Sequence, residues 1–249
     1  MSDSVQEIKG NFMDINNFVK SYWNYYIELE KRMEETRRYV EYDECNHNTY
    51  SSNYLMLFQT VCSEIDVVGK ELAAYYYPDF ENENGSKPIN RWWYEIQDQL
   101  PNVFREISFA GSYNLNPWKN FRINKVISHQ MRNGNPVDVT NYNLQQKNNG
   151  ITYSTPSWWN AYNKVKHKRL HVDNDGVNYK KANQINISNS FAALYLLEFE
   201  FLKQIGTVEE RIKYCSKSVL FGMGELQYAY IDALIYDEEN ETATFINTK

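Results

Sequence analysis

The residues best suited to chemistry lie between Thr155 and Arg169, where an aromatic start gives way to a cationic stretch that contains a histidine. Thr155 can cap a helix with its hydroxyl, and Pro156 suits the first helical position because its missing N–H would have no partner there. Helical spacing then places five of the side chains that follow on one stripe. This stripe consists of Trp159, Asn163, Lys166, His167 and Leu170. Since a tryptophan anchors the stripe, we expect its polar end to face the interior, where charges are costly unless they are paired.

These residue types suit acid–base chemistry on a phosphate ester. His167 can act as a general acid or base near neutral pH. Lys166 and Arg169 can hold phosphate, the arginine through two parallel hydrogen bonds. Asn163, one helical turn before the histidine, can orient the imidazole or the substrate. We expect Trp159 and Tyr162 to support the site as packed aromatic side chains.

A second cluster lies on an earlier predicted helix and comprises Glu64, Asp66 and Lys70. Paired carboxylates can do acid–base work, and Lys70 is a further cation that could bind a substrate. Such residues are more often salt bridges that join helices, and Asp66 and Lys70 have the i,i+4 spacing of a helical pair. Lys166 or Arg169 would be natural partners across the bundle. In this structural alternative, His167 is hydrogen-bonded to Asp66 or Glu64 in the core and the lysines are solvated.

Two other patterns allow a ligand but favour simpler explanations. His167 and His171 have an HxxxH spacing that can bind zinc, yet no glutamate occupies the metalloprotease position and the flanking cations oppose a divalent ion. Trp92 and Trp93 could stack on a base, although adjacent aromatics at a helix start are usually core residues. We therefore expect no metal and no cofactor. Phosphate-binding glycine loops, nucleophile elbows and thiol motifs are absent from the sequence.

The composition limits the partners and the compartment. With 249 residues, a net charge of −6 and a pI of about 5.4, a generally phosphate-coating surface is not expected, although a local basic pocket is compatible with these values. The three cysteines have no CxxC spacing, which is typical of free thiols in a reducing compartment. Residues 1–11 have no apolar core of a signal peptide, and the run 191–202 is interrupted by two glutamates. We expect a cytoplasmic protein without a membrane partner.

The hydrophobic spacing predicts a mainly α fold, an up-and-down helical bundle in a single domain over residues 1–249. An irregular insertion over 109–156 could contain a β-hairpin around Asn133-Gly134-Asn135-Pro136, between strands at 121–130 and 137–144. Residues 226–236 are apolar enough for a strand or a docking helix, and 237–249 are expected to be a tail. The predicted helices cover residues 14–40, 53–77, 89–100, 156–170 and 179–204.

Three segments of the chain resemble bacterial proteins of the HEPN-like group. They are Ser63-Glu64-Ile65-Asp66, the stretch from Trp158 to Arg169, and Ala192-Ala193-Leu194-Tyr195-Leu196-Leu197-Glu198. The resemblance covers the bundle helices, about half of the chain, and implies a bundle of four to five helices that is commonly a homodimer. It also implies a metal-independent ribonuclease, often part of a toxin–antitoxin or anti-phage system. The signature of that activity is an arginine, four to six residues, then a histidine.

The chain departs from this signature at the arginine. His167 matches the family histidine, and Asn163 matches the polar residue that often follows the arginine, but Ala161 and Tyr162 occupy the arginine's place. Arg122 and His129 have the correct spacing but lie in the insertion. Without the cation, a developing phosphorane is not stabilised unless Lys166, Arg169 or a partner chain supplies the charge.

Two functions follow from the sequence. The first is RNA- or nucleotide-directed activity in defence or stress, with His167 as the acid or base, Asn163 orienting it, and Lys166, Arg169 and Lys70 binding substrate. In the usual chemistry, a neutral histidine removes the proton of a ribose 2′-OH, which attacks the adjacent phosphate. The second is a non-catalytic scaffold that binds a nucleotide or a protein partner such as an antitoxin.

Overall fold

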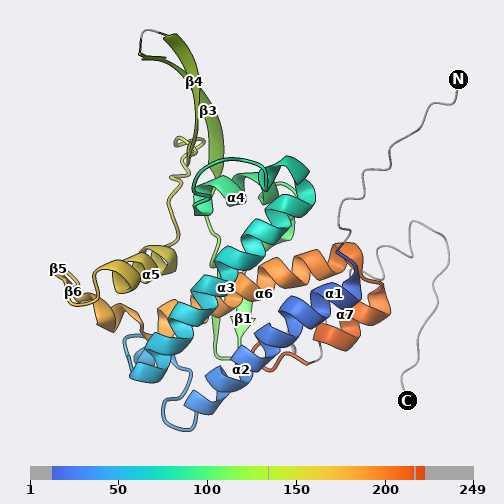
Figure 1. Cartoon of the computed structure of the whole chain (residues 1–249). Coiled ribbons are helices and arrows are strands. Elements are labelled where there is room, and N and C mark those ends of the chain that lie inside the picture. The colour runs from blue at the N-terminus through green and yellow to red at the C-terminus, as the bar shows by residue number, and fades with distance from the viewer. Residues whose placement is uncertain (1–12, 134, 216, 222–249) are drawn as a thin grey trace, which may run out of the picture.

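The fold is mainly α, as the hydrophobic spacing predicts. The computed structural model describes residues 13–133, 135–215 and 217–221 (Figure 1). The α-helices are α1 (Ile15–Phe18), α2 (Asn24–Thr36), α3 (Ser52–Tyr76), α4 (Ile89–Ile96), α5 (Ser157–His167), α6 (Gln184–Ile205) and α7 (Val208–Cys215). Short helical turns are η1 (Val19–Trp23), η2 (Glu44–Asn46), η3 (Pro78–Phe80), η4 (Pro101–Phe104) and η5 (Asn178–Lys181). The strands are β1 (Ile107–Phe109), β2 (Tyr113–Leu115), β3 (Ile123–Arg132), β4 (Asn135–Leu144), β5 (Val172–Asp173) and β6 (Gly176–Val177).

The first predicted helix is present but is not uniform. Asp14 caps it by accepting a hydrogen bond from the backbone N–H of Asn17, and a π-helical turn, η1, joins α1 to α2. The helix ends at Thr36 rather than near Val40. The Thr36 hydroxyl donates to the carbonyl oxygen of Met33 at 2.6 Å, a local bond that competes with helix continuation.

The second helix begins and ends close to its predicted bounds. The Ser51 hydroxyl accepts a hydrogen bond from the N–H of Tyr54 at 3.1 Å, which caps α3. Pro78 follows the last helical turn, because proline cannot continue a helix. Helices α2 and α3 run in opposite directions and are joined by residues 37–51 (Figure 1).

Helix α3 is central to the packing, since it contacts α2, α4, α5 and α6. Its contact with α4 depends on Gly69, where an added Cβ would lie 2.6 Å from the Trp92 ring. Trp92 and Trp93 are both fully buried, and the Trp93 ring stacks on Trp118 with centroids 4.2 Å apart. The two tryptophans of α4 are therefore core residues, and neither is available to stack on a base.

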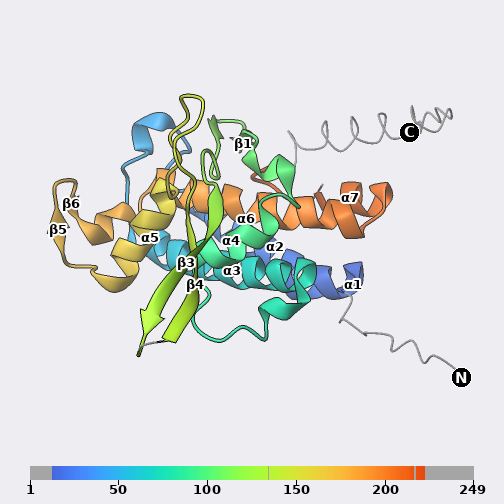
Figure 2. The same cartoon turned by 90° about the horizontal axis from the view of Figure 1, so that it is seen from above.

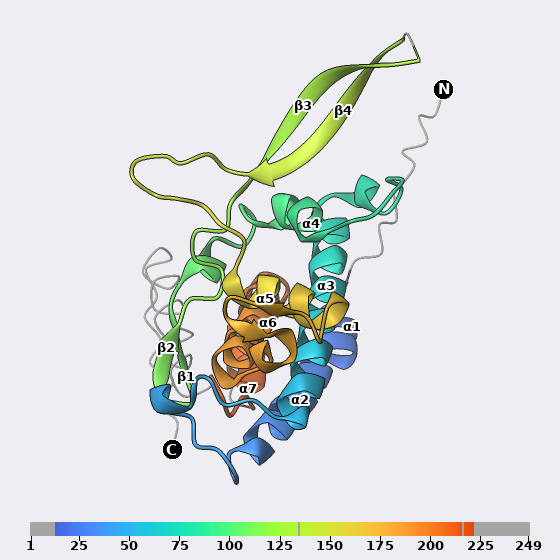
Figure 3. The same ribbon diagram turned by 90° about the vertical axis from the view of Figure 1, so that its left-hand side faces the viewer.

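The expected hairpin within 109–156 is present. Strands β3 and β4 pair antiparallel, with Ile123 opposite Leu144 and Arg132 opposite Asn135. Only the base of this ribbon is buried, and most of its length is exposed. Figures 1 and 3 show that it projects away from the helices as an arm. Two smaller antiparallel pairs, β1–β2 and β5–β6, complete the strands of the described chain.

Helix α6 passes through the middle of the core. The Asn183 side chain caps it and Gly206 follows its last residue, as predicted for the glycine. Every residue from Ser190 to Leu202 is buried, which is typical of a helix covered on all sides. None of the described helices is long and apolar enough to cross a membrane. The segments 226–236 and 237–249 lie outside the described residues.

Candidate functional site

Helix α5, which contains the predicted site, starts one residue later than its sequence suggests. Pro156 occupies the N-cap position, and no side chain caps the helix, so the expected Thr155 cap is wrong. The helix buries Trp158, Trp159, Tyr162 and other apolar residues against the core. The rings of Trp159 and Tyr162 lie 5.2 Å apart, so these two side chains pack together beneath the site.

The polar end of the predicted stripe faces solvent rather than the interior. Lys166 and His167 are exposed, and Asn163 is half-buried. The helix ends at His167, and Lys168 has the non-helical φ of −141°. Leu170 therefore lies beyond the helix and is 81% exposed. The expectation of inward-facing chemistry is wrong, because the buried face of α5 runs through Trp158, Tyr162 and Val165, and Lys166 and His167 lie off that face in the last turn.

The cluster on α3 has partners other than those predicted. Asp66 accepts a hydrogen bond from the Lys70 ammonium at 2.5 Å and another from the Trp92 indole N–H at 3.1 Å. The expected Asp66–Lys70 pair is thus present, whereas no bond joins Asp66 to His167 in the described chain. Lys70 is paired with Asp66 on its own helix rather than with a residue of α5. Asp66 instead links α3 to α4.

The segment that follows α5 concentrates cations on one exposed lobe. Six lysine and arginine side chains lie between residues 164 and 181, against two aspartates. Figure 2 shows β5 and β6 at the edge of the molecule, far from α1 and α7. All residues from Lys166 to Val172 are exposed. A chain with net negative charge therefore has a local basic surface here.

Some of these cations are paired and others are free. Asp173 accepts from Lys164 at 2.8 Å and from Lys181 at 3.0 Å, and these ammonium groups hold the pKa of Asp173 well below its ordinary value. In the described part of the chain, no acidic group pairs with Lys168 or Arg169. The Lys166 ammonium lies over the Tyr162 ring, 5.3 Å from its centroid. The free cations remain available to an anion from solution.

A pocket lies beside this lobe, with a volume of about 520 Å³. It is formed by α5, the start of α6, η5 and the loop before α3. Its lining includes Lys164, Lys180, Lys181, Tyr50 and Asp175. Carboxamides also line it, from Asn48, Asn160, Asn183 and Asn186. The Lys180 ammonium lies 5.2 Å from the Tyr50 ring centroid. Lysine amines can bind a phosphate, carboxamides can bind the edge of a base, and an exposed aromatic ring can stack on it. This combination of residues suits a nucleotide.

This pocket is the part of the site that sequence reasoning missed. The stripe through Asn163 and His167 lies on a different face of α5 from Asn160 and Lys164, which line the pocket. Neither His167 nor Arg169 lines it. Asn160 and Lys164 have the i,i+4 spacing of one helical face, and this signal could have been found. The contributions of Asn48 and Tyr50 depend on tertiary contacts and could not.

The alternative arginine and histidine of the insertion lie apart. Arg122 is held at the base of the arm by Asp98, at 2.5 Å. His129 lies along β3, where its Nδ1 is 2.5 Å from Asp138. Seven residues of extended strand span about 23 Å, so the two side chains do not meet at one phosphate.

A buried acidic residue is the second feature that the sequence did not indicate. Glu198 on α6 is completely buried, and among the described residues neither of its carboxylate oxygens has a hydrogen-bond partner. Burial raises the pKa of Glu198 well above its ordinary value, and the nearby Glu64 carboxylate raises it further. Burial also raises the pKa of Glu64. No group of three or more His, Cys, Asp or Glu in the described chain could hold a metal.

Comparison with known proteins found no relative of this chain. No family model, no curated protein and no solved structure matches the chain. The site's chemistry is therefore the basis for a function.

Proposed function

We propose that this chain is a HEPN-like helical protein that binds RNA or nucleotide phosphates through the basic lobe between residues 164 and 181 and the adjoining pocket. The observation that supports this most is the excess of exposed cations on the lobe of a chain whose net charge is −6. Nucleic-acid affinity depends mainly on neutralising phosphates, and such a local surface suffices for weak binding.

The pocket supports a single-stranded ligand. Tyr50 is 42% exposed and lines the pocket beside Lys180. Base stacking on an aromatic ring contributes about 1–3 kcal/mol per base and tolerates any sequence. The side-chain amides of Asn160 and Asn186 each give one N–H to a backbone carbonyl, and their remaining N–H and their oxygens can pair with base edges. A phosphate backbone on the lobe and one base in the pocket would use both surfaces together.

Metal-independent RNA cleavage is a second candidate function, and the exposure of His167 favours it. The imidazole lies in solvent between the cations Lys166 and Lys168, where a ribose 2′-OH could reach it. A general base is usually oriented by a third group, and no such bond to His167 is present among the described residues. A second copy in a homodimer could supply that group and the missing cation. Binding alone requires neither, so we place it first.

The test of binding is fluorescence anisotropy with a labelled single-stranded RNA and the full chain. Lys168→Glu combined with Arg169→Glu should weaken binding about tenfold or more. The slope of the logarithm of the binding constant against the logarithm of the salt concentration should become shallower by about 0.7 for each phosphate contact that is lost. The matched control is Lys20→Glu combined with Lys31→Glu, which changes the net charge equally on exposed positions of η1 and α2. Equal losses in both double variants would contradict a site on the lobe.

A further inference from the structure

The arm formed by β3 and β4 has two faces of different chemistry. Residues directly opposite each other in an antiparallel pair lie on the same side, and successive residues alternate between the two sides. The register pairs Val126 with Asn141 and Gln130 with Val137. One side therefore carries a row of carboxamides and one guanidinium, and we call it the amide face. These groups belong to Asn124, Gln130, Arg132, Asn135, Asn141 and Asn143.

Hydrogen bonds between side chains agree with this assignment of the amide face. The Ser128 hydroxyl accepts from Nε2 of Gln130 at 3.5 Å and from Nδ2 of Asn141 at 3.4 Å. Side chains of both strands thus meet on one side of the arm. Within the described chain, neither of these two carboxamide oxygens accepts a hydrogen bond, so both are available to a ligand.

The opposite face of the arm is the one that contacts the helices. Tyr142, near the base, packs on the Tyr94 ring with centroids 5.3 Å apart, and the Arg91 guanidinium lies 4.5 Å from the centroid of the Tyr142 ring. Further along the arm, this opposite face holds His129 and Asp138, whose side chains pair with each other. The amide face is therefore the side of the arm that is turned away from α4.

The charge of the arm favours a polyanion as the ligand of the amide face. Between residues 107 and 156 the sequence has five lysine and arginine residues and a single carboxylate, Asp138, although the net charge of the whole chain is −6. Asp138 lies on the opposite face, so the described residues of the amide face include no carboxylate. The Arg132 guanidinium is exposed and has no ion pair within the described chain. An anionic ligand would meet no repulsion on this face.

The dimensions of the arm fit one kind of nucleic-acid surface. The major groove of B-form DNA is about 12 Å wide and admits a two-stranded β-ribbon. The eight residues from Lys125 to Arg132 span about 27 Å, the rise of about eight base pairs. An A-form RNA duplex has a deep and narrow major groove that side chains cannot enter, and a single strand has no groove.

The side chains of the amide face match what this groove displays. Asparagine and glutamine pair with the N6 and N7 atoms of adenine, and arginine pairs with O6 and N7 of guanine. Val126 and Val137 lie on the same face and are 44% and 38% exposed. Apolar side chains in such positions can contact the methyl group of thymine.

We propose that the β3–β4 arm is a second binding site, whose amide face enters the major groove of double-stranded DNA. Gln130, Asn141 and Arg132 contact base edges, while lysines beside the ribbon contact phosphates. This site is separate from the basic lobe and does not depend on the RNA binding proposed for that lobe.

The test measures binding of the full chain to a fluorescently labelled DNA duplex by anisotropy. We expect the DNA duplex to bind about tenfold more tightly than an RNA duplex of the same sequence, whose major groove is closed to side chains. Replacing guanine and adenine by their 7-deaza analogues removes the N7 acceptors from the major groove and should weaken binding about fivefold. Equal affinity for the DNA and RNA duplexes, or no effect of the 7-deaza bases, would overturn the proposal.

A pair of arm variants tests which face is used. Gln130→Ala combined with Arg132→Ala removes one carboxamide and one cation from the amide face and should weaken DNA binding about tenfold or more. Lys125→Ala combined with Thr140→Ala lies on the opposite face and should weaken it by less than about threefold. All four side chains are exposed, so the fold does not depend on them. Equal losses in the two variants would contradict a contact through the amide face.

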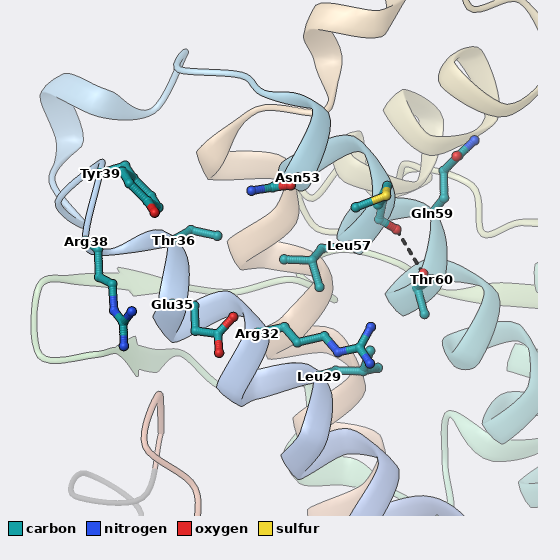
Figure 4. A pocket seen from close by; sticks show the side chains of 11 residues that line it. Leu29, Arg32, Glu35, Thr36, Arg38, Tyr39, Asn53, Leu57, Gln59 and Thr60 are labelled. Carbon is teal, nitrogen blue, oxygen red and sulfur yellow. Dashed lines mark hydrogen bonds between the residues drawn. The ribbon is translucent and has the colours of Figure 1, made fainter.

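A matched control away from the arm comes from a groove between α2 and α3, at the opposite end of the molecule (Figures 1 and 4). Arg38 and Gln59 both line this groove, whose volume is about 740 Å³. Arg38→Ala combined with Gln59→Ala removes the same two groups, a guanidinium and a carboxamide. The DNA affinity should stay within about twofold of that of the natural chain. A loss as large as that of the arm variant would be an effect of net charge and would overturn the proposal.

Two further measurements separate the arm from the lobe and from self-association. Lys168→Glu combined with Arg169→Glu, in the lobe, should keep the preference for the DNA duplex over the RNA duplex. A chain that binds the DNA duplex through the arm but binds no single-stranded RNA would contradict the lobe site alone. Sedimentation velocity should give the same oligomeric state for the natural chain and for Gln130→Ala combined with Arg132→Ala. A change from dimer to monomer would assign the amide face to a second copy of the chain and overturn the DNA site.

Discussion

The Ser218 hydroxyl donates to Oε1 of Glu30 at 2.6 Å, although 188 residues separate the two in sequence. The same carboxylate accepts from the Val219 N–H and from the Tyr26 hydroxyl. Glu30 is fully buried, and burial raises its pKa although these hydrogen bonds lower it. A buried carboxyl group with several hydrogen-bond donors thus joins Ser218 and Val219 to α2.

We predict that Glu30→Ala lowers the free energy of unfolding by about 2–4 kcal/mol, because the buried hydroxyls of Tyr26 and Ser218 and the partly buried Val219 N–H lose their acceptor. Glu30→Gln should cost less, since its carbonyl still accepts from Ser218. Denaturant unfolding followed by circular dichroism measures both. Glu28→Ala, an exposed change on the same helix, is the control and should stay within about 0.5 kcal/mol. A Glu30→Ala variant as stable as that control would contradict the account.

Glu198 gives a prediction of pH-dependent stability. Burial raises its pKa in the folded chain, so the folded state holds the proton more tightly than the unfolded state does. The resulting stabilisation is complete below the unfolded pKa of about 4.3, and it is lost as the pH rises through the folded pKa. Glu64, whose pKa is also raised by burial, acts in the same direction.

Glu198→Gln should therefore lose less stability than the natural chain between pH 5 and pH 8. Urea unfolding across that range measures the difference between the two curves. Glu28→Gln, which removes an exposed carboxylate from α2, controls for the change in net charge. Parallel curves for Glu198→Gln and the natural chain would show that Glu198 does not bind its proton as the burial requires.

Asp173→Asn should strengthen RNA binding severalfold. This effect is opposite to that of replacing the free cations Lys168 and Arg169. Its removal leaves the ammonium groups of Lys164 and Lys181 without their shared partner. The RNA affinity should also fall more steeply with salt concentration, because more cations can contact phosphates. Asp98→Asn makes the same charge change beside Arg122, at the base of the arm. If both variants gain equally, the effect is one of net charge and the lobe is not the binding surface.

The helices were largely predictable because their ends have local chemical causes. Ser51 and Pro78 mark the bounds of α3 through a side-chain cap and a missing N–H. The arm was predictable because Asn133-Gly134 favours a tight turn between alternating strands. The π-helical turn at Val19–Trp23 was not, because no local residue pattern marks where a helix widens to i→i+5 bonds.

The site was less predictable, since its location depends on where α5 ends and on what packs beside it. Helical spacing correctly predicted that Trp159 is buried and that Asp66 pairs with Lys70. It wrongly turned Lys166 and His167 inward, because the face of α5 that packs on the core runs through Trp158, Tyr162 and Val165. The burial of Glu198 required knowledge of every neighbour of α6, and one sequence does not provide that.

The proposed cleavage activity predicts that the full chain degrades mixed cellular RNA in excess EDTA and that His167→Ala abolishes this. General acid–base catalysis contributes about 10²–10⁴-fold, so the loss should be of that order. His171→Ala, a nearby exposed histidine, should keep the activity. RNA that stays intact at high protein concentration and long times would exclude catalysis and leave binding as the function.

The most direct test of the central claim is to map where RNA contacts the chain. Single-stranded RNA containing 4-thiouridine is crosslinked to the full chain, and the modified peptides are identified by mass spectrometry. The account predicts adducts within residues 157–186 and at Tyr50, which line the lobe and its pocket. Adducts confined to the β3–β4 arm or to other surfaces, or no crosslinking at low salt, would contradict it.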